Sequence, residues 1–115
     1  MSPTLVFDGE GRVVMAIGSP GGSRIIGYVT KALIAALDWK MDIQKAVDYP
    51  NFVNRNGPLE IEEGTHLAGL KPALEAMGHE VRLLSHHSGL ISIIATKDGL
   101  EGGADKRREG KALGD

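Results

Sequence analysis

The stretch Gly18–Ser23 (GSPGGS) decides how this chain folds, because it joins a strand pattern to a helix pattern. Before it, residues 12–17 (RVVMAI) are almost wholly apolar, so we expect a strand that is buried on both faces. After it, apolar residues recur every three or four positions over residues 24–37, which predicts a helix. The loop therefore lies where a helix begins, and free backbone amides and the positive end of the helix dipole meet there.

The glycine pair Gly21 and Gly22 would let another molecule approach the loop backbone closely. A loop of this kind can hold an anion, such as a phosphate, a carboxylate or the oxyanion of an acyl-transfer intermediate. Phosphate is the weaker choice, because the Lys and Ser/Thr that end a nucleotide-binding P-loop are missing. The spacing leaves a simpler interpretation open, a tight turn whose glycines serve packing alone.

On the N-terminal side of the loop, the pattern predicts a hairpin. Residues 4–7 (TLVF) pair with the strand at 12–17, and the turn at residues 8–11 (DGEG) supplies the positive φ positions that it needs. Past the long helix, Asp42 is the expected N-cap of a short helix over residues 43–48, which a proline ends.

The second half of the chain predicts short strands around one helix. We expect an irregular loop over residues 51–58, then a strand over residues 59–62 with one wet face. An apolar stripe predicts a helix that begins near Leu70, holds Pro72 in its first turn and ends at Gly78. The other expected segments are strands at residues 81–84 and 90–96 and a polar tail at residues 100–115.

The order ββααβαββ predicts an α+β fold with a largely antiparallel sheet, in a single domain over residues 1–115. The composition, 42% hydrophobic and 24% charged, is typical of a globular domain. Thirteen Lys and Arg against fifteen Asp and Glu give a net charge of −2, so we expect neither nucleic acid nor a membrane as a partner. The absence of cysteine excludes disulfides, thiolate metal sites and cysteine nucleophiles. The first residues lack the features of a signal peptide, and the localisation stays open.

Other polar residues carry weaker signals. His86 and His87 could ligate a metal, but adjacent side chains of an extended chain point to opposite faces, so we predict exposed loop histidines and no metal site. Residues 106–111 (KRREGK) could hold phosphate, although a solvated tail is favoured. Glu60, Glu62 and Glu63 are assigned to a wet strand face rather than to an acid/base pair. Three asparagines in the preceding loop are assigned to turns rather than to a cleft.

Five segments of the sequence together resemble one known family. They are residues 1–4 (MSPT), 18–26 (GSPGGSRII), 50–52 (PNF), 59–63 (LEIEE) and 103–110 (GADKRREG). In this order they resemble the C-terminal part of the small subunit of the γ-glutamyltransferase family, also called γ-glutamyltranspeptidase or glutathione hydrolase. The resemblance covers essentially the whole chain, and it departs at Lys106, where the family commonly has proline.

The resemblance implies the fold and chemistry of an N-terminal-nucleophile hydrolase. That fold is an αββα sandwich in which two largely antiparallel sheets pack between helices. Each member is made as a precursor that cleaves itself. The threonine that becomes the N-terminus of the small subunit then attacks the γ-glutamyl amide of glutathione and related compounds. Gly21 and Gly22 correspond to the family's glycine pair, whose backbone amides form the oxyanion hole, and no cofactor is implied.

The family's nucleophile lies in a Thr-Thr-His-like segment, and a substrate-binding Ser-Ser pair comes directly before the residues that match Met1 to Pro3. The resemblance therefore implies a C-terminal fragment that takes a γ-glutamyl substrate only within a complete enzyme. A catalytic role for Ser2, exposed by removal of Met1, is not expected, because Ser2 matches a position well downstream of the nucleophile.

We expect the apolar strands at residues 12–17 and 90–95 to be covered by the missing N-terminal part or by self-association. The alternative is a stand-alone, non-catalytic module for binding or assembly that keeps only the fold of its hydrolase ancestors. The sequence leaves open the choice between hydrolysis and transfer, the acceptor and the oligomeric state.

Overall fold

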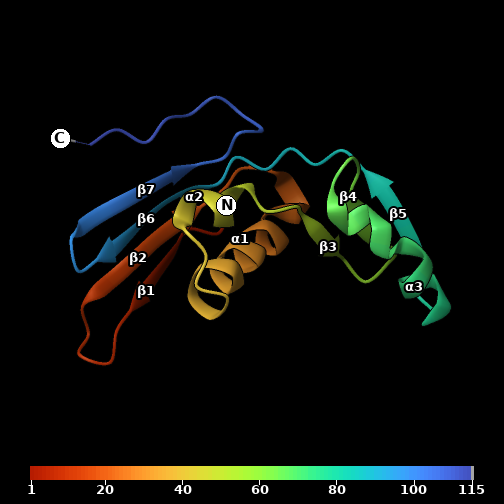
Figure 1. Cartoon of the computed structure of the whole chain (residues 1–115), viewed down its shortest axis with the longest axis horizontal. Coiled ribbons are helices and arrows are strands. Elements are labelled where there is room, and N and C mark those ends of the chain that lie inside the picture. The colour runs from red at the N-terminus through yellow and green to blue at the C-terminus, as the bar shows by residue number, and fades with distance from the viewer. Residues whose placement is uncertain (115) are drawn as a thin grey trace.

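The computed structural model describes residues 1–114, and the strands among them form two sheets. The four-stranded sheet has the order β1-β2-β6-β7 and is antiparallel throughout. Its strands are β1 (Thr4–Phe7), β2 (Val13–Gly18), β6 (Ile91–Thr96) and β7 (Gly99–Ala104). Figure 1 shows this sheet at one end of the molecule and the smaller sheet at the other. The α+β fold class that the element order predicts is confirmed.

The predicted β1–β2 hairpin is present, and contacts within its turn close it. One carboxylate oxygen of Asp8 accepts hydrogen bonds from the backbone amides of Glu10 (2.8 Å) and Arg12 (3.0 Å), which closes the turn. Gly11 has a φ of 80°, a conformation that favours glycine. The pairing runs from Thr4 opposite Ile17, with a shift of register close to Phe7.

The helix predicted over residues 24–37 is present in three consecutive pieces. It begins as the 3-10 turn η1 (Gly22–Arg24), continues as α1 (Ile25–Leu33) and ends in the π-helical turn η2 (Ile34–Asp38). The helix α2 (Ile43–Asp48) follows, and the Asp42 carboxylate accepts hydrogen bonds from the Gln44 and Lys45 amides, so the predicted N-cap is confirmed.

The hydrophobic core lies between α1, α2 and one face of the four-stranded sheet (Figure 1). Aliphatic side chains, alanines and the ring of Tyr28 build it, and the small alanines let the helices approach the sheet closely. Its most buried members are Met15, Tyr28, Ala32, Ala35, Ala46, Val47 and Leu90.

The smaller sheet holds β3 (Phe52–Asn54), β4 (Leu59–Glu62) and β5 (Val81–Leu84). β3 and β4 are antiparallel, whereas β4 and β5 are parallel, because the 3-10 helix η3 (His66–Leu70) and the helix α3 (Lys71–Ala76) cross over between them. The start of α3 with a proline in its first turn is confirmed. The loop predicted over residues 51–58 is wrong at β3, which pairs with β4 through Phe52 opposite Ile61.

The polar tail predicted from Leu100 is also wrong in its first part, because residues 99–104 form β7 along β6. Glycine has a poor strand propensity, so the sequence of β7 (GLEGGA) gave no strand pattern. A side chain at Gly103 would lie 3.1 Å from the Ile43 carbonyl oxygen, since the first turn of α2 packs on the β7 backbone there. The glycine thus follows from helix packing.

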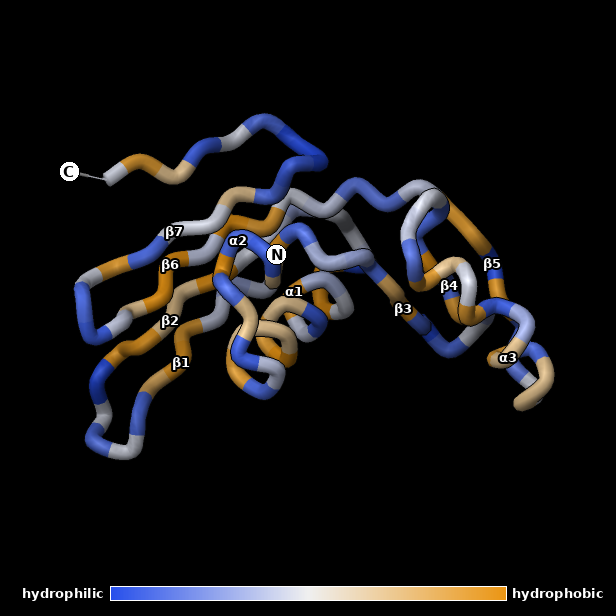
Figure 2. The backbone as a smooth tube through the Cα atoms, viewed as in Figure 1, coloured by the Kyte–Doolittle hydropathy of each residue, from blue (hydrophilic) through white to orange (hydrophobic). Residues whose placement is uncertain are grey.

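The other face of the four-stranded sheet is apolar and only partly covered among the described residues, because the tail after β7 reaches it beside Ile91 and Gly102. Leu5, Ala16 and Ile93 lie opposite one another across three strands, so they share this face. Leu5 is 58% exposed and Ile93 is 49% exposed, so β2 and its neighbours are buried on one face alone. The prediction of a strand buried on both sides is wrong for these residues. Figure 2 shows the hydrophobic stretches along β1, β2 and β6.

The helices of the structure over residues 1–114 include none with the length and apolar character that crossing a bilayer requires.

Candidate functional site

The glycine pair occupies the loop between β2 and η1 in a conformation that needs glycine. Gly21 has a φ of 138° and Gly22 a φ of 63°, both in the region that other residues rarely adopt. A Cβ on Gly21 would lie 2.7 Å from Cε2 of the Tyr28 ring. The loop backbone therefore lies directly against Tyr28, and no side chain fits between them.

Within residues 1–114, no hydrogen bond is formed by the backbone amides of Gly21 and Gly22, whereas the Gly21 carbonyl accepts from the Arg24 amide. These two amides lie at the N-cap and first residue of η1, which continues into α1, so they stand at the positive end of the helix dipole. Gly22 is exposed and Gly21 is partly exposed. The pair can thus donate hydrogen bonds to an anionic oxygen that approaches from outside.

Ser19 fixes the first half of the loop from the inside of the protein. Its hydroxyl accepts a hydrogen bond from the Gly89 amide (3.1 Å) and donates one to the Pro20 carbonyl oxygen (2.7 Å). Ser19 is 2% exposed. A Cβ on Gly89 would lie 2.8 Å from Cγ of Pro20, so a glycine is required at position 89.

An ion-pair cluster fixes the second half of the loop. Arg24 donates two hydrogen bonds to the Glu60 carboxylate, at 2.6 and 3.1 Å. Arg55 donates to the same carboxylate (2.8 Å) and to the Ser23 hydroxyl (2.7 Å). The hydrogen bond from Arg24 is the main cause that lowers the pKa of Glu60 to about 2, so this carboxylate is ionised at neutral pH. The loop is therefore tied to β4 through charged groups.

His86 lies buried beneath this cluster. Its ring packs edge-on against Tyr28, with ring centroids 5.8 Å apart, and its Nε2 lies 3.5 Å from a carboxylate oxygen of Glu60. Neither ring nitrogen has a hydrogen-bond partner among the described residues. Burial lowers the pKa of His86 below its ordinary value, although the Glu60 carboxylate opposes this shift.

A second buried network joins β4 to the segment after β7. Arg107 donates hydrogen bonds to both Glu62 carboxylate oxygens (2.6 and 2.7 Å) and to Asp105 (2.9 Å). Burial opposes the ionisation of Glu62, but the hydrogen bonds from Arg107 lower the pKa of Glu62 below its ordinary value. The other carboxylate oxygen of Asp105 accepts from the Ser88 hydroxyl and from the Leu90 amide. This network holds the chain that precedes β6, where Gly89 meets Ser19.

The whole chain, residues 1–115, matches the model of the gamma-glutamyltranspeptidase family. The chain belongs to this family. It is 36% identical to the glutathione hydrolase proenzyme of Escherichia coli (strain K12) over 110 residues, which cover 93% of this chain and 19% of that relative. It is also 36% identical to the Acylase ACY 1 proenzyme of Pseudomonas sp. (strain SE83) over 112 residues, 96% of this chain and 20% of that relative.

The fold of this family member agrees with that of solved gamma-glutamyltranspeptidases. A crystal structure of a mutant Helicobacter pylori gamma-glutamyltranspeptidase matches it with a TM-score of 0.84 and 32% identity, over 94% of this chain and 61% of that chain. The predicted N-terminal-nucleophile hydrolase fold is thereby confirmed. The chain spans about a fifth of the length of the two curated relatives, so it corresponds to a C-terminal part of a larger enzyme.

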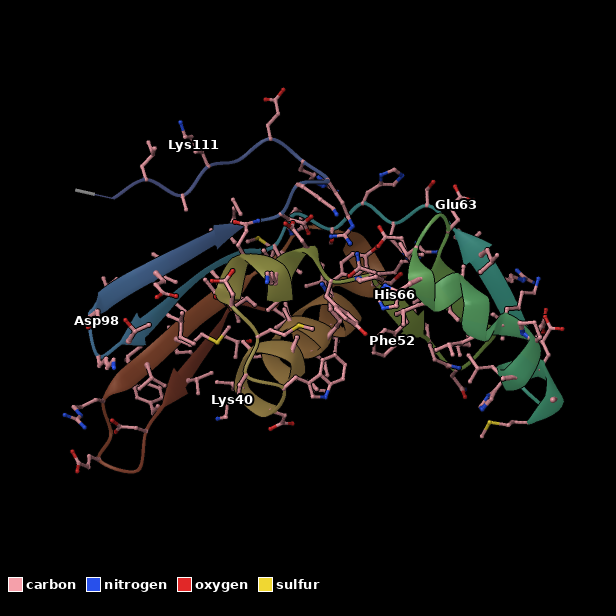
Figure 3. The ribbon with its side chains drawn as sticks, viewed as in Figure 1. Lys40, Phe52, Glu63, His66, Asp98 and Lys111 are labelled. Carbon is pink, nitrogen blue, oxygen red and sulfur yellow. The ribbon has the colours of Figure 1, made fainter. Side chains whose placement is uncertain are left out.

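Sequence patterns predicted the wrong exposure for several charged residues of this family member. Glu60 and Glu62 are 7% and 8% exposed, so the predicted wet face is wrong for both. Arg107, predicted in a solvated tail, has a side chain that is only 9% exposed, because Glu62 and Asp105 neutralise it. The predicted exposure holds for Lys111, which Figure 3 shows on the outer side of the tail.

The two adjacent histidines differ in environment. His86 is 4% exposed, so the prediction of an exposed loop histidine is wrong for it, whereas His87 is exposed as predicted. Asn51 is fully buried and donates to the Ser88 hydroxyl (2.9 Å), so its assignment to a turn is also wrong. No cluster of metal-ligating side chains occurs within the part of the chain that the structure describes.

Lys31 is a buried charged residue that sequence reasoning did not single out. Its ammonium group donates to three carbonyl oxygens near the end of α2, those of Ala46, Val47 and Tyr49, at 2.9–3.2 Å. Burial lowers the pKa of Lys31 to about 7. The sequence around Lys31 gave no signal of burial. Its carbonyl acceptors lie in and just after α2, 15–18 positions further along the chain.

Proposed function

We propose that this chain is the C-terminal part of an enzyme that hydrolyses or transfers γ-glutamyl amides, and that Gly21 and Gly22 form its oxyanion hole. The observation that carries the proposal is the pair of unengaged backbone amides at the start of a helix, held in a left-handed conformation against Tyr28. Such amides stabilise an oxyanion without reorganising during the reaction.

The proposed chemistry needs a nucleophile from the part of the enzyme that precedes this chain. An N-terminal threonine hydroxyl would attack the amide carbonyl carbon and leave a negative charge on its oxygen. The Gly21 and Gly22 amides would donate hydrogen bonds to that oxygen, and the amine would then leave with a proton. The resulting γ-glutamyl ester would pass its acyl group to water or to an acceptor amine.

The preceding part of the enzyme would also cover the partly open face of the four-stranded sheet. Leu5 and Ile93 are about half exposed on that face. The burial of this apolar surface would bring the nucleophile and the glycine loop into one structure. We therefore expect no γ-glutamyl hydrolysis from the 115-residue chain alone, because an oxyanion hole without a nucleophile gives only modest acceleration.

A second acyl group deserves the same test, because the Acylase ACY 1 proenzyme is as similar to this chain as the Escherichia coli glutathione hydrolase proenzyme is. The oxyanion chemistry would be the same for any acyl amide. The third possibility, a non-catalytic module that binds a small carboxylate at the glycine loop, predicts binding without turnover.

The experiment compares Gly21→Ala with wild type in the complete enzyme. The added methyl group would collide with Tyr28 and displace the amides, so we expect kcat for a γ-glutamyl anilide to fall about 100-fold or more. Gly9→Ala is the matched control, because nothing lies within 4 Å of a Cβ there. Retention of kcat by Gly21→Ala would contradict the oxyanion role.

Cleavage assays and a binding measurement on the wild-type enzyme separate the γ-glutamyl enzyme from the acylase and from the binding module. A wild-type enzyme that cleaves a simple acyl anilide but not the γ-glutamyl anilide would favour an acylase. A protein that cleaves neither, yet binds glutamate in a calorimeter, would favour the binding module.

A further inference from the structure

We infer that Ser19 is a positioning residue that sets the orientation of the Gly21 amide, through a hydroxyl held by Gly89 from the segment before β6. The inference rests on the proposed oxyanion role of that amide. The inference adds to the oxyanion hole a residue that touches neither substrate nor nucleophile and acts through the loop backbone.

The first step concerns the peptide group between Pro20 and Gly21. The Pro20 carbonyl oxygen and the Gly21 N–H belong to one planar unit and point in opposite directions from it. The Ser19 hydroxyl donates to that carbonyl oxygen at 2.7 Å. Fixing the carbonyl therefore fixes the direction of the Gly21 N–H on the other side of the same plane.

The second step is that this peptide group needs such a restraint. Gly21 has no side chain to limit its backbone, and its φ of 138° lies in a region that glycine enters and leaves easily. Rotation of the Pro20–Gly21 peptide group would reverse the N–H while leaving the neighbouring residues nearly in place. An oxyanion donor that rotates in this way would be lost from the site for part of the time.

The third step is that the Ser19 hydroxyl is itself held in one orientation. It accepts a hydrogen bond from the Gly89 amide at 3.1 Å, so its own proton is directed to Pro20. Ser19 is 2% exposed, and thus water does not compete for either bond. The two hydrogen bonds connect positions 70 residues apart in the sequence.

The fourth step concerns what holds Gly89. Its neighbour Ser88 is fully buried, donates its hydroxyl proton to Asp105 and accepts a hydrogen bond from Asn51 (2.9 Å). On the other side, the Leu90 amide donates to the same Asp105 oxygen (3.2 Å). Asp105 therefore fixes the residues on both sides of Gly89, and the restraint passes from the end of β7 to the glycine loop.

The test measures steady-state kinetics of the complete enzyme for Ser19→Ala, with Ser92→Ala as the matched control. Ser92 is also buried and also donates to one backbone carbonyl, that of Ala16 (3.0 Å), but it lies within the sheet. We expect kcat of Ser19→Ala to fall about tenfold while KM changes less than twofold, since the Pro20 carbonyl is restrained by one hydrogen bond of ordinary strength, which the variant lacks. Ser92→Ala should lose comparable thermal stability and keep kcat.

Ser88→Ala is the second variant, because it removes a smaller part of the same restraint. We expect kcat to fall in the same direction and by less than for Ser19→Ala. Equal losses of stability and unchanged kcat in all three variants would overturn the inference and leave Ser19 with a structural role alone.

A crystal structure of Ser19→Ala separates this inference from the proposed function. If the wild-type enzyme cleaves no acyl amide, the proposed function fails, and the orientation of the Pro20–Gly21 peptide group in the variant still decides the inference. A rotated or doubly occupied peptide group supports it, and a single unchanged orientation overturns it.

Discussion

Glu60 shows how strongly one residue of this chain depends on partners that are distant in sequence. Arg24 lies 36 positions before it, and the two side chains form a pair of hydrogen bonds close to the glycine loop. Neither residue carries a signal of this pairing in its own neighbourhood, because an alternating charge pattern is also typical of an exposed strand. The same holds for Glu62 and Arg107, which are 45 positions apart.

The ion pairs of Glu60 predict a specific dependence of stability on pH. The folded-state pKa of about 2 lies below the ordinary value of 4.5, so the pairs contribute stability above about pH 4.5 and lose it as the pH falls towards 2. We expect Glu60→Gln to reduce the free energy of unfolding by about 1–3 kcal/mol at pH 7. The difference from wild type should shrink between pH 5 and pH 2, as measured by urea unfolding.

Exposed Glu101→Gln is the control for the change of charge, and its effect should stay within about 0.5 kcal/mol over this range. A difference between wild type and Glu60→Gln that is the same at pH 7 and at pH 2.5 would contradict the assignment of Glu60 as an ionised partner of Arg24.

At the scale of the elements, the sequence predicted those that local chemistry defines. Asp42 caps α2 and Gly11 closes the first hairpin, because each acts within a few residues of itself. The strand β3 was missed because it is only three residues long, and β7 was missed because it is rich in glycine; pairing with β4 and β6 creates them. The spacing singled out the glycine loop, whereas it gave no sign of the contacts that Ser19, Glu60 and His86 make, because long-range packing creates them.

The packing of α2 on β7 predicts the effect of a side chain at Gly103. A Cβ there would lie 3.1 Å from the Ile43 carbonyl oxygen and 3.3 Å from the Gln44 amide nitrogen. Both atoms belong to the first turn of α2, which the Asp42 cap holds in place. We expect Gly103→Ala to lower the free energy of unfolding by about 1–2 kcal/mol, measured by urea unfolding.

Gly57→Ala is the matched control, because nothing lies within 4 Å of a Cβ at Gly57 and its φ imposes no strain. A Gly103→Ala variant as stable as Gly57→Ala would mean that α2 can move away from the sheet, and the close packing would then not explain the glycine.

At the scale of the whole molecule, the helices cover one face of the four-stranded sheet, whereas the other face is covered only in part, by the tail beside β7. The row Leu5, Ala16 and Ile93 crosses the partly open face, and Ile91 adds a further side chain that is 51% exposed. An apolar surface of this kind on a sheet is typical of an interface. The chain spans about a fifth of the length of the two curated relatives named above, and the proposal that a preceding part of the enzyme covers this face gives the apolar surface a role.

The partly open face predicts how the 115-residue chain behaves when it is produced alone. We expect association that increases with concentration in sedimentation velocity, together with binding of a dye that detects apolar surface, because burial of the partly open face stabilises any contact between copies. Ile93→Lys places a charge in the centre of this face, and it should reduce both signals. Met77→Lys is the matched control, since Met77 is 74% exposed but follows α3 at the other end of the molecule (Figure 1). A wild-type chain that sediments as a monomer and binds no dye would show that this face is stable in water. That result would contradict the proposal that the rest of the enzyme covers the face.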